Sequence, residues 1–136
     1  MDKPLRIIIS GGGTGGHIFP AVSIANAIMA KHPDAQILFV GALGRMEMQR
    51  VPQAGYQIKG LPVRGLARPL YSPKNIGVII DYFRSKRLAK KIVRSFKPQV
   101  AVGVGGYASA AALNAAESLG VPCLIQEQNS YAGKTN

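Results

Sequence analysis

The chain has 136 residues, which suits one compact domain with a single core, and 47% of its residues are apolar. Seventeen lysines and arginines outnumber six acidic residues, and the formal charge of +11 indicates an anionic partner such as nucleic acid, acidic lipid or a phosphorylated substrate. A single cysteine excludes an internal disulfide, and no run of ~18 apolar residues is present to span a bilayer.

Strands and helices are expected to alternate along the chain. The expected strands are Leu5–Ser10, Gln36–Val40, Tyr56–Leu61, Gln99–Val102 and Pro122–Gln126. The expected helices are Phe19–Lys31, Arg45–Gln53, Pro73–Phe96 and Tyr107–Leu119. This alternation predicts an α/β fold, a Rossmann-like doubly wound parallel sheet with right-handed crossovers.

A glycine-rich loop joins the first strand to the first helix, and it reads Gly11-Gly12-Gly13-Thr14-Gly15-Gly16-His17. Glycine has no Cβ to keep a ligand away from the backbone, and the helix that follows directs free N–H groups at an anion. A tight turn alone would need only one or two glycines. The loop therefore predicts a phosphate or nucleotide-sugar site.

Two common phosphate loops fit this segment poorly. The spacing of Gly11, Gly13 and Gly16 matches a dinucleotide fold, but the second strand runs into Gly41-Ala42 without the acidic residue that holds the ribose. A P-loop needs Lys and then Ser or Thr after its last glycine, whereas this chain has His17-Ile18. A nucleotide-dependent oxidoreductase therefore stays only as a weaker alternative.

Two further loops follow the fourth and fifth strands, at the sheet edge where such folds bind ligands. They read Gly103-Val104-Gly105-Gly106-Tyr107 and Glu127-Gln128-Asn129. Together with the glycine-rich loop they predict a single cleft. His17 and Glu127 are the candidates for accepting a proton, although a helix cap and a solvated turn residue are the structural alternatives. Asn129 suits either a turn or sugar hydroxyls.

A basic cluster lies in and just after the second half of the long helix expected over Pro73–Phe96. It follows an apolar run, Ile76–Ile80. Its members are Arg84, Lys86, Arg87, Lys90, Lys91, Arg94 and Lys97, with no acidic residue among them. Charge alone also allows a nucleic-acid-binding module. The sequence argues against nucleic acid as a partner, because it contains no recognisable reading motif and its aromatics form no stacking platform.

Four ordered motifs resemble the MurG family of peptidoglycan glycosyltransferases. They are Gly11–His17 with Phe19-Pro20-Ala21, Gly103–Ser109, Glu127-Gln128-Asn129, and Gly133-x-Thr135-Asn136. The segments Arg45-Met46-Glu47 and Val51-Pro52-x-x-Gly55-Tyr56 also match. One departure is Ser109-Ala110-Ala111, where the family usually has Ser-Gly-Pro.

The resemblance implies the N-terminal half of a GT-B glycosyltransferase. Residues 1–136 would be the acceptor-binding domain, and the C-terminal donor-binding domain would be absent, so this chain alone would be inactive. The reaction would transfer GlcNAc from UDP-GlcNAc to lipid I and form lipid II, by an inverting displacement without metal or cofactor. Another GT-B enzyme with a different nucleotide sugar remains the alternative.

The resemblance also assigns roles to particular residues. His17 is the first choice for the catalytic base, with Glu127 as competitor. The remaining substrate-binding residues are expected to be Thr14, Gly15, Gly16, Gly105, Gly106, Tyr107, Gln128 and Asn129.

Lipid I lies in the cytoplasmic leaflet of the bacterial inner membrane, so the family resemblance implies peripheral docking on an anionic surface. No signal peptide precedes the first strand, and Cys123 is interpreted as a core residue, which agrees with a reducing cytoplasm. The residues expected to dock are Ile76, Ile79, Ile80, Phe83, Lys86, Arg87, Lys90 and Lys91. The alternative is that the four apolar residues form the ordinary core face of a helix.

Overall fold

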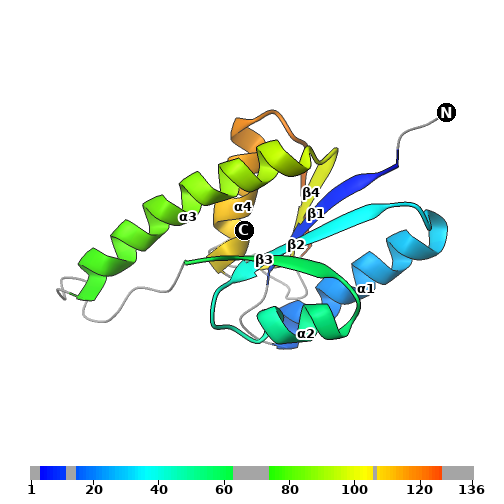
Figure 1. Cartoon of the computed structure of the whole chain (residues 1–136), viewed down its shortest axis with the longest axis horizontal. Coiled ribbons are helices and arrows are strands. Elements are labelled where there is room, and N and C mark those ends of the chain that lie inside the picture. The colour runs from blue at the N-terminus through cyan, green and yellow to red at the C-terminus, as the bar shows by residue number, and fades with distance from the viewer. Residues whose placement is uncertain (1–3, 12–14, 63–73, 106, 127–136) are drawn as a thin grey trace.

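The computed structural model describes residues 4–11, 15–62, 74–105 and 107–126 (Figure 1). Its centre is a parallel five-stranded sheet in the order β3-β2-β1-β4-β5. The strands are β1 (Arg6–Ser10), β2 (Gln36–Ala42), β3 (Gln57–Leu61), β4 (Val100–Gly103) and β5 (Cys123–Ile125). The order reverses between β1 and β4, which is the switch point of a doubly wound fold.

Within the part of the chain that the structure describes, four helices cover the two faces of this sheet. They are α1 (Gly15–Lys31), α2 (Glu47–Gln53), α3 (Lys74–Phe96) and α4 (Tyr107–Ser118). Figure 1 shows α1 and α2 on one face and α3 and α4 on the other. All nine expected elements are present, and the predicted α/β doubly wound parallel sheet is confirmed.

The alternation of side chains along β1 builds a separate core on each face. Ile8 packs into the cluster beneath α3 and α4, whereas Ile7 and Ile9 join the cluster that includes Ala21 and Ala25 of α1. Successive residues of a strand point to opposite faces, so a continuous apolar run is needed when both faces are covered. This two-sided burial explains why β1 consists largely of isoleucine.

Helix α1 begins earlier than the sequence suggested, at Gly15 instead of Phe19. Pro20 favours a helix start because proline has no N–H to donate, which is why the expected boundary lay beside it. In the structure Pro20 lies inside the helix. The earlier start brings the last glycines of the loop into the first turn of α1.

Cys123 is only half-buried, so its interpretation as a core residue was partly wrong. It lies on β5, an edge strand of the described sheet, where Leu124 and Ile125 are also exposed. Its Sγ donates to the Val121 carbonyl at 3.4 Å. Burial, and secondarily the charge of Glu117, raises the pKa of this thiol.

Candidate functional site

The carboxyl ends of β1, β2 and β4 are tied together just before the glycine-rich loop. Ser10 Oγ donates to the Val40 carbonyl at 2.8 Å, and the Val104 N–H donates to the Ser10 carbonyl at 2.9 Å. Ser10 is fully buried, so its hydroxyl has no access to competing water. These bonds fix the position from which the glycine-rich loop departs.

The first and second glycine motifs meet at this edge. A Cβ on Gly11 would lie 2.2 Å from Val104 Cγ2 and 2.8 Å from the Gly105 carbonyl oxygen. No other residue type could occupy position 11 without displacing the second loop, because these distances are below van der Waals contact. Gly105 itself has a φ of +105°, a conformation that side chains rarely adopt.

Two helices begin at the same edge. α1 starts at Gly15, within the glycine-rich segment Gly11–His17, and α4 starts at Tyr107, the last residue of the second glycine motif. Neither helix has an acidic residue in its first turn. The positive dipole ends of the two helices therefore favour an anion at this edge, because no carboxylate in their first turns offsets them.

The structure places the sequence-predicted site residues only in part. Gly105 lies in the described loop after β4, and it is buried. Backbone positions are described for four more, which lie in first helical turns: Gly15, Gly16, His17 and Tyr107. The others lie outside the described residues: Thr14, Gly106, Glu127, Gln128 and Asn129. Their predicted roles stay predictions.

Glu47 is a buried carboxylate near this edge that the sequence analysis quoted only as part of a motif. Its side chain is 1% exposed, and its Oε2 accepts a hydrogen bond from the Ala42 N–H at 2.9 Å. The chain passes Gly41 so closely that a Cβ there would lie 2.4 Å from Glu47 Cγ. Glu47 thus anchors the connection between β2 and α2. A carboxylate at the start of a helix is an ordinary solvated feature, so sequence alone gave no sign of its burial.

The four apolar residues expected to dock are on the outside of α3, not on its core face. Ile76 is 63% exposed, Ile79 51%, Ile80 53% and Phe83 63%. The core face is formed by other residues of the helix, and these include Val78, Ala89, Ile92 and Val93. The alternative that placed these four side chains in the core is therefore wrong.

The exposed stripe continues along α3 as positive charge. Steps of three or four residues keep one helical face, and they lead from Phe83 to the exposed Arg87, Lys91 and Arg94. We call this surface the outward face of α3: Ile76, Ile79, Ile80 and Phe83, followed by Arg87, Lys91 and Arg94. Lys86 and Lys90, also expected to dock, are half-buried beside it. No helix within the described ranges is long and apolar enough to cross a membrane.

Comparisons with known proteins agree with this architecture. The profile of the glycosyltransferase family 28 N-terminal domain matches residues 7–136. A crystal structure of Acinetobacter baumannii MurG superposes with a TM-score of 0.82 at 28% identity, over 98% of this chain and 38% of that one. The Streptomyces glycosyltransferase SsfS6, at 17% identity and a TM-score of 0.67, shares the fold.

Curated relatives are closer in sequence. The chain is 67% identical over 136 residues to a Bacteroides thetaiotaomicron protein and 66% identical to one from Phocaeicola vulgatus. Both are named UDP-N-acetylglucosamine--N-acetylmuramyl-(pentapeptide) pyrophosphoryl-undecaprenol N-acetylglucosamine transferase. The match covers all of this chain and 36% of each relative.

The sheet order and the two glycine motifs at its switch point define the N-terminal domain of a GT-B type glycosyltransferase. The chain belongs to glycosyltransferase family 28 and matches that family's N-terminal domain. The resemblance to MurG that the motifs predicted is confirmed.

Proposed function

We propose that this chain is the acceptor-binding half of an enzyme that transfers GlcNAc from UDP-GlcNAc to lipid I. The observation that carries the proposal is the meeting of the two glycine motifs, with Gly11 against Val104 and Gly105, where α1 and α4 begin. The names of the 66–67% identical relatives supply the substrates. The chain spans 36% of those relatives, so the donor-binding part would lie in sequence beyond the matched segment.

The proposed reaction is a displacement with inversion at the anomeric carbon of GlcNAc. The C4 hydroxyl oxygen of the acceptor's N-acetylmuramoyl sugar bonds to that carbon while the bond to the UDP oxygen breaks. The hydroxyl proton passes to His17, or to Glu127 if His17 only orients phosphate. UDP leaves with the electron pair of the broken bond.

Helix N-termini would stabilise the negative charge in this reaction. The first turns of α1 and α4 lie at this edge of the sheet, and the N–H groups that a helix leaves without an intrahelical partner at its start favour diphosphate without any side-chain cation. The glycines of the first loop would let the acceptor diphosphate approach the backbone. The proposal also includes the expected contacts with the substrates, which would be made by Thr14, Gly15, Gly16, Gly106, Tyr107, Gln128 and Asn129.

The outward face of α3 is proposed to hold the protein on an anionic membrane. A helix between parallel strands begins at the carboxyl edge of the sheet, so the apolar half of this face lies toward the same edge as the glycine motifs (Figure 1). A lipid-linked acceptor could then reach the loops without leaving the bilayer. Exposed apolar side chains beside lysines and arginines are the usual composition of a surface-bound helix. The corresponding location would be the cytoplasmic face of the inner membrane.

A binding titration tests the acceptor assignment. This chain would replace the matching segment of the Bacteroides thetaiotaomicron relative, and the chimera would be titrated with a water-soluble lipid I analogue and, separately, with NADH. We expect saturable binding of the analogue and none of NADH. Binding of NADH alone would support the oxidoreductase alternative and contradict the proposal.

A further inference from the structure

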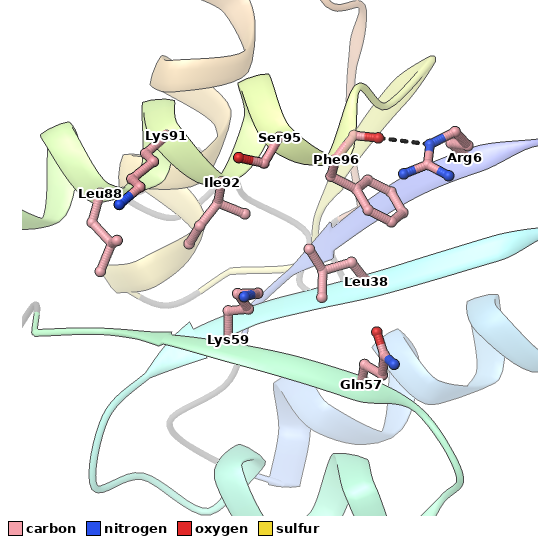
Figure 2. A pocket seen from close by; sticks show the side chains of 9 residues that line it. All are labelled: Arg6, Leu38, Gln57, Lys59, Leu88, Lys91, Ile92, Ser95 and Phe96. Carbon is pink, nitrogen blue, oxygen red and sulfur yellow. Dashed lines mark hydrogen bonds between the residues drawn. The ribbon is translucent and has the colours of Figure 1, made fainter.

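A groove lies between α3 and the β2–β3 side of the sheet, toward the amino ends of the strands (Figure 2). Its volume is about 350 Å³. It is lined by Arg6, Leu38, Gln57, Lys59, Leu88, Lys91, Ile92, Ser95 and Phe96. The glycine motifs lie at the carboxyl ends of the strands, so this groove is separate from the proposed transfer site.

The lining combines an apolar floor with positive charge. Leu38 and Ile92 are buried at the bottom, and Leu88 and Phe96 add half-buried apolar surface. Three lining residues are cationic and none is acidic. A site with this composition is complementary to a molecule that carries both an apolar segment and a negative charge.

The three cations differ in the interactions that they already make within the protein. Arg6 donates through Nε to the Phe96 carbonyl at 2.6 Å, donates to Gln36 Oε1, and lies 4.3 Å from the centre of the Phe96 ring. Lys59 and Lys91 form no ion pair with any described residue. Figure 2 shows both amines directed toward the space between α3 and β3. These two ammonium groups are the ones available to a ligand.

We propose that this groove binds an anionic phospholipid, with one acyl chain along Leu38, Leu88 and Ile92 and the headgroup phosphate between Lys59 and Lys91. The volume is at the low end of ligand pockets, roughly 300–1,000 Å³, which suits one acyl segment rather than a whole lipid. Lys91 also belongs to the outward face of α3, so the groove opens beside the surface proposed to meet the membrane. A lipid could enter from that side.

The inference does not depend on glycosyl transfer. It differs from docking on a bilayer because it requires a single lipid to occupy the groove. Lys59 lies on β3 and not on α3, so its replacement leaves the outward face of α3 intact. Ser95 is an exposed residue of the groove, and a larger side chain there would occupy the acyl position without changing charge. Replacing Lys59 therefore tests the role of the positive charge, and enlarging Ser95 separately tests the role of the open groove.

The experiment titrates the full-length chimera described above by calorimetry with dioctanoyl phosphatidylglycerol as dissolved monomers, so that no bilayer is present. Dioctanoyl phosphatidylcholine and inorganic phosphate are the comparison ligands. We expect saturable binding of the anionic lipid, weakened at least tenfold by Lys59→Gln and by Ser95→Phe. Lys31→Gln, an exposed charge at the end of α1, is the matched control and should change nothing.

Four results would overturn the inference. The first three are the absence of saturable binding, equal binding of inorganic phosphate, and equal loss in Lys31→Gln and Lys59→Gln. Unchanged binding by a folded Ser95→Phe chimera would equally overturn it, because the acyl chain would then lie elsewhere. Thermal unfolding verifies that each variant folds, and Ser95→Leu substitutes if the phenylalanine variant does not. Turnover with a lipid I analogue, measured on the same proteins, tests the transfer reaction independently.

Discussion

Ser10 at the end of β1 donates a side-chain hydrogen bond to the Val40 carbonyl of β2 across 2.8 Å, in a position without solvent exposure. The bond joins two parallel strands at the residue before the glycine-rich loop. It links the stability of the sheet to the geometry of the candidate site, because the loop departs directly from the bonded residue.

Replacement of Ser10 by alanine should lower the free energy of unfolding by about 1–2 kcal/mol, since a buried carbonyl loses its best donor. The Gly11 N–H approaches the same carbonyl at 3.4 Å and would compensate only weakly. Urea unfolding measures the effect. Ser23→Ala, on an exposed position of α1, is the control and should not destabilise the protein. Equal stability of the two variants would show that the bond contributes nothing.

Gly11→Ala should destabilise the protein by about 1–3 kcal/mol and reduce turnover of the chimera, because the new methyl group overlaps Val104 and the Gly105 carbonyl. Gly44→Ala is the control that distinguishes the effect of this steric clash from the effect of backbone conformation. Gly44 has a φ of +79°, yet a Cβ there would meet nothing within 4 Å. Gly44→Ala should cost about 1 kcal/mol through its φ alone and leave turnover unchanged. A Gly11→Ala variant with full activity would contradict the close approach of the two loops.

Ser85→Ala should stabilise the protein. The Ser85 hydroxyl is fully buried on α3 and has no hydrogen-bond partner among the described residues. Its removal should contribute about 1 kcal/mol through the relieved desolvation, in addition to the higher helix propensity of alanine. Ser95→Ala, exposed on the same helix, measures the propensity effect alone. Thermal or urea unfolding in which the two variants gain equally would contradict the prediction.

His17→Ala in the chimera should lower kcat by at least ~100-fold if His17 accepts the hydroxyl proton, which is the usual scale for a lost acid–base group. Steady-state assays with UDP-GlcNAc and a soluble lipid I analogue measure it. His32→Ala is the matched control, because His32 is exposed just beyond the other end of α1. A loss smaller than tenfold would remove His17 from the catalytic role and leave Glu127 as the candidate.

Neutralisation of four cations beside the apolar stripe should abolish cosedimentation with anionic vesicles. The variant changes Lys86, Arg87, Lys90 and Lys91 to glutamine. Each charge near such a surface contributes about 1 kcal/mol, so four account for roughly a thousandfold in affinity. A control variant with Lys31, Arg45 and Arg50 changed to glutamine loses three charges at exposed positions outside this cluster and should keep its binding. Equal binding by the two variants would locate the docking surface elsewhere.

Periodicity and glycine spacing predicted the order of elements because β1, β2 and β4 are largely buried on both faces and each connection between elements contains glycine or proline. β1 is the clearest case, since Ile7, Ile8 and Ile9 supply both cores. The start of α1 was less predictable, because Pro20 marks a helix start in isolation but is accommodated inside this helix.

The burial of individual side chains could not be predicted, because it depends on tertiary contacts that the sequence pattern does not reveal. Glu47 is buried only because the β2–α2 connection folds it beneath Gly41, and its hydrogen bond to Ala42 compensates the burial. Phe83 is exposed because it lies on the side of α3 opposite the core residues. An amphipathic pattern with two apolar stripes does not reveal which stripe faces the sheet.

Turnover of the chimera is the most direct test of the central claim. The chain would be joined to the remainder of the Bacteroides thetaiotaomicron relative and assayed with UDP-GlcNAc and a soluble lipid I analogue. We predict release of UDP matched by formation of the disaccharide product, at a rate within about tenfold of the relative and strongly reduced by Gly11→Ala. A folded chimera that binds neither substrate and releases no UDP would contradict the assignment of this chain as the acceptor-binding half.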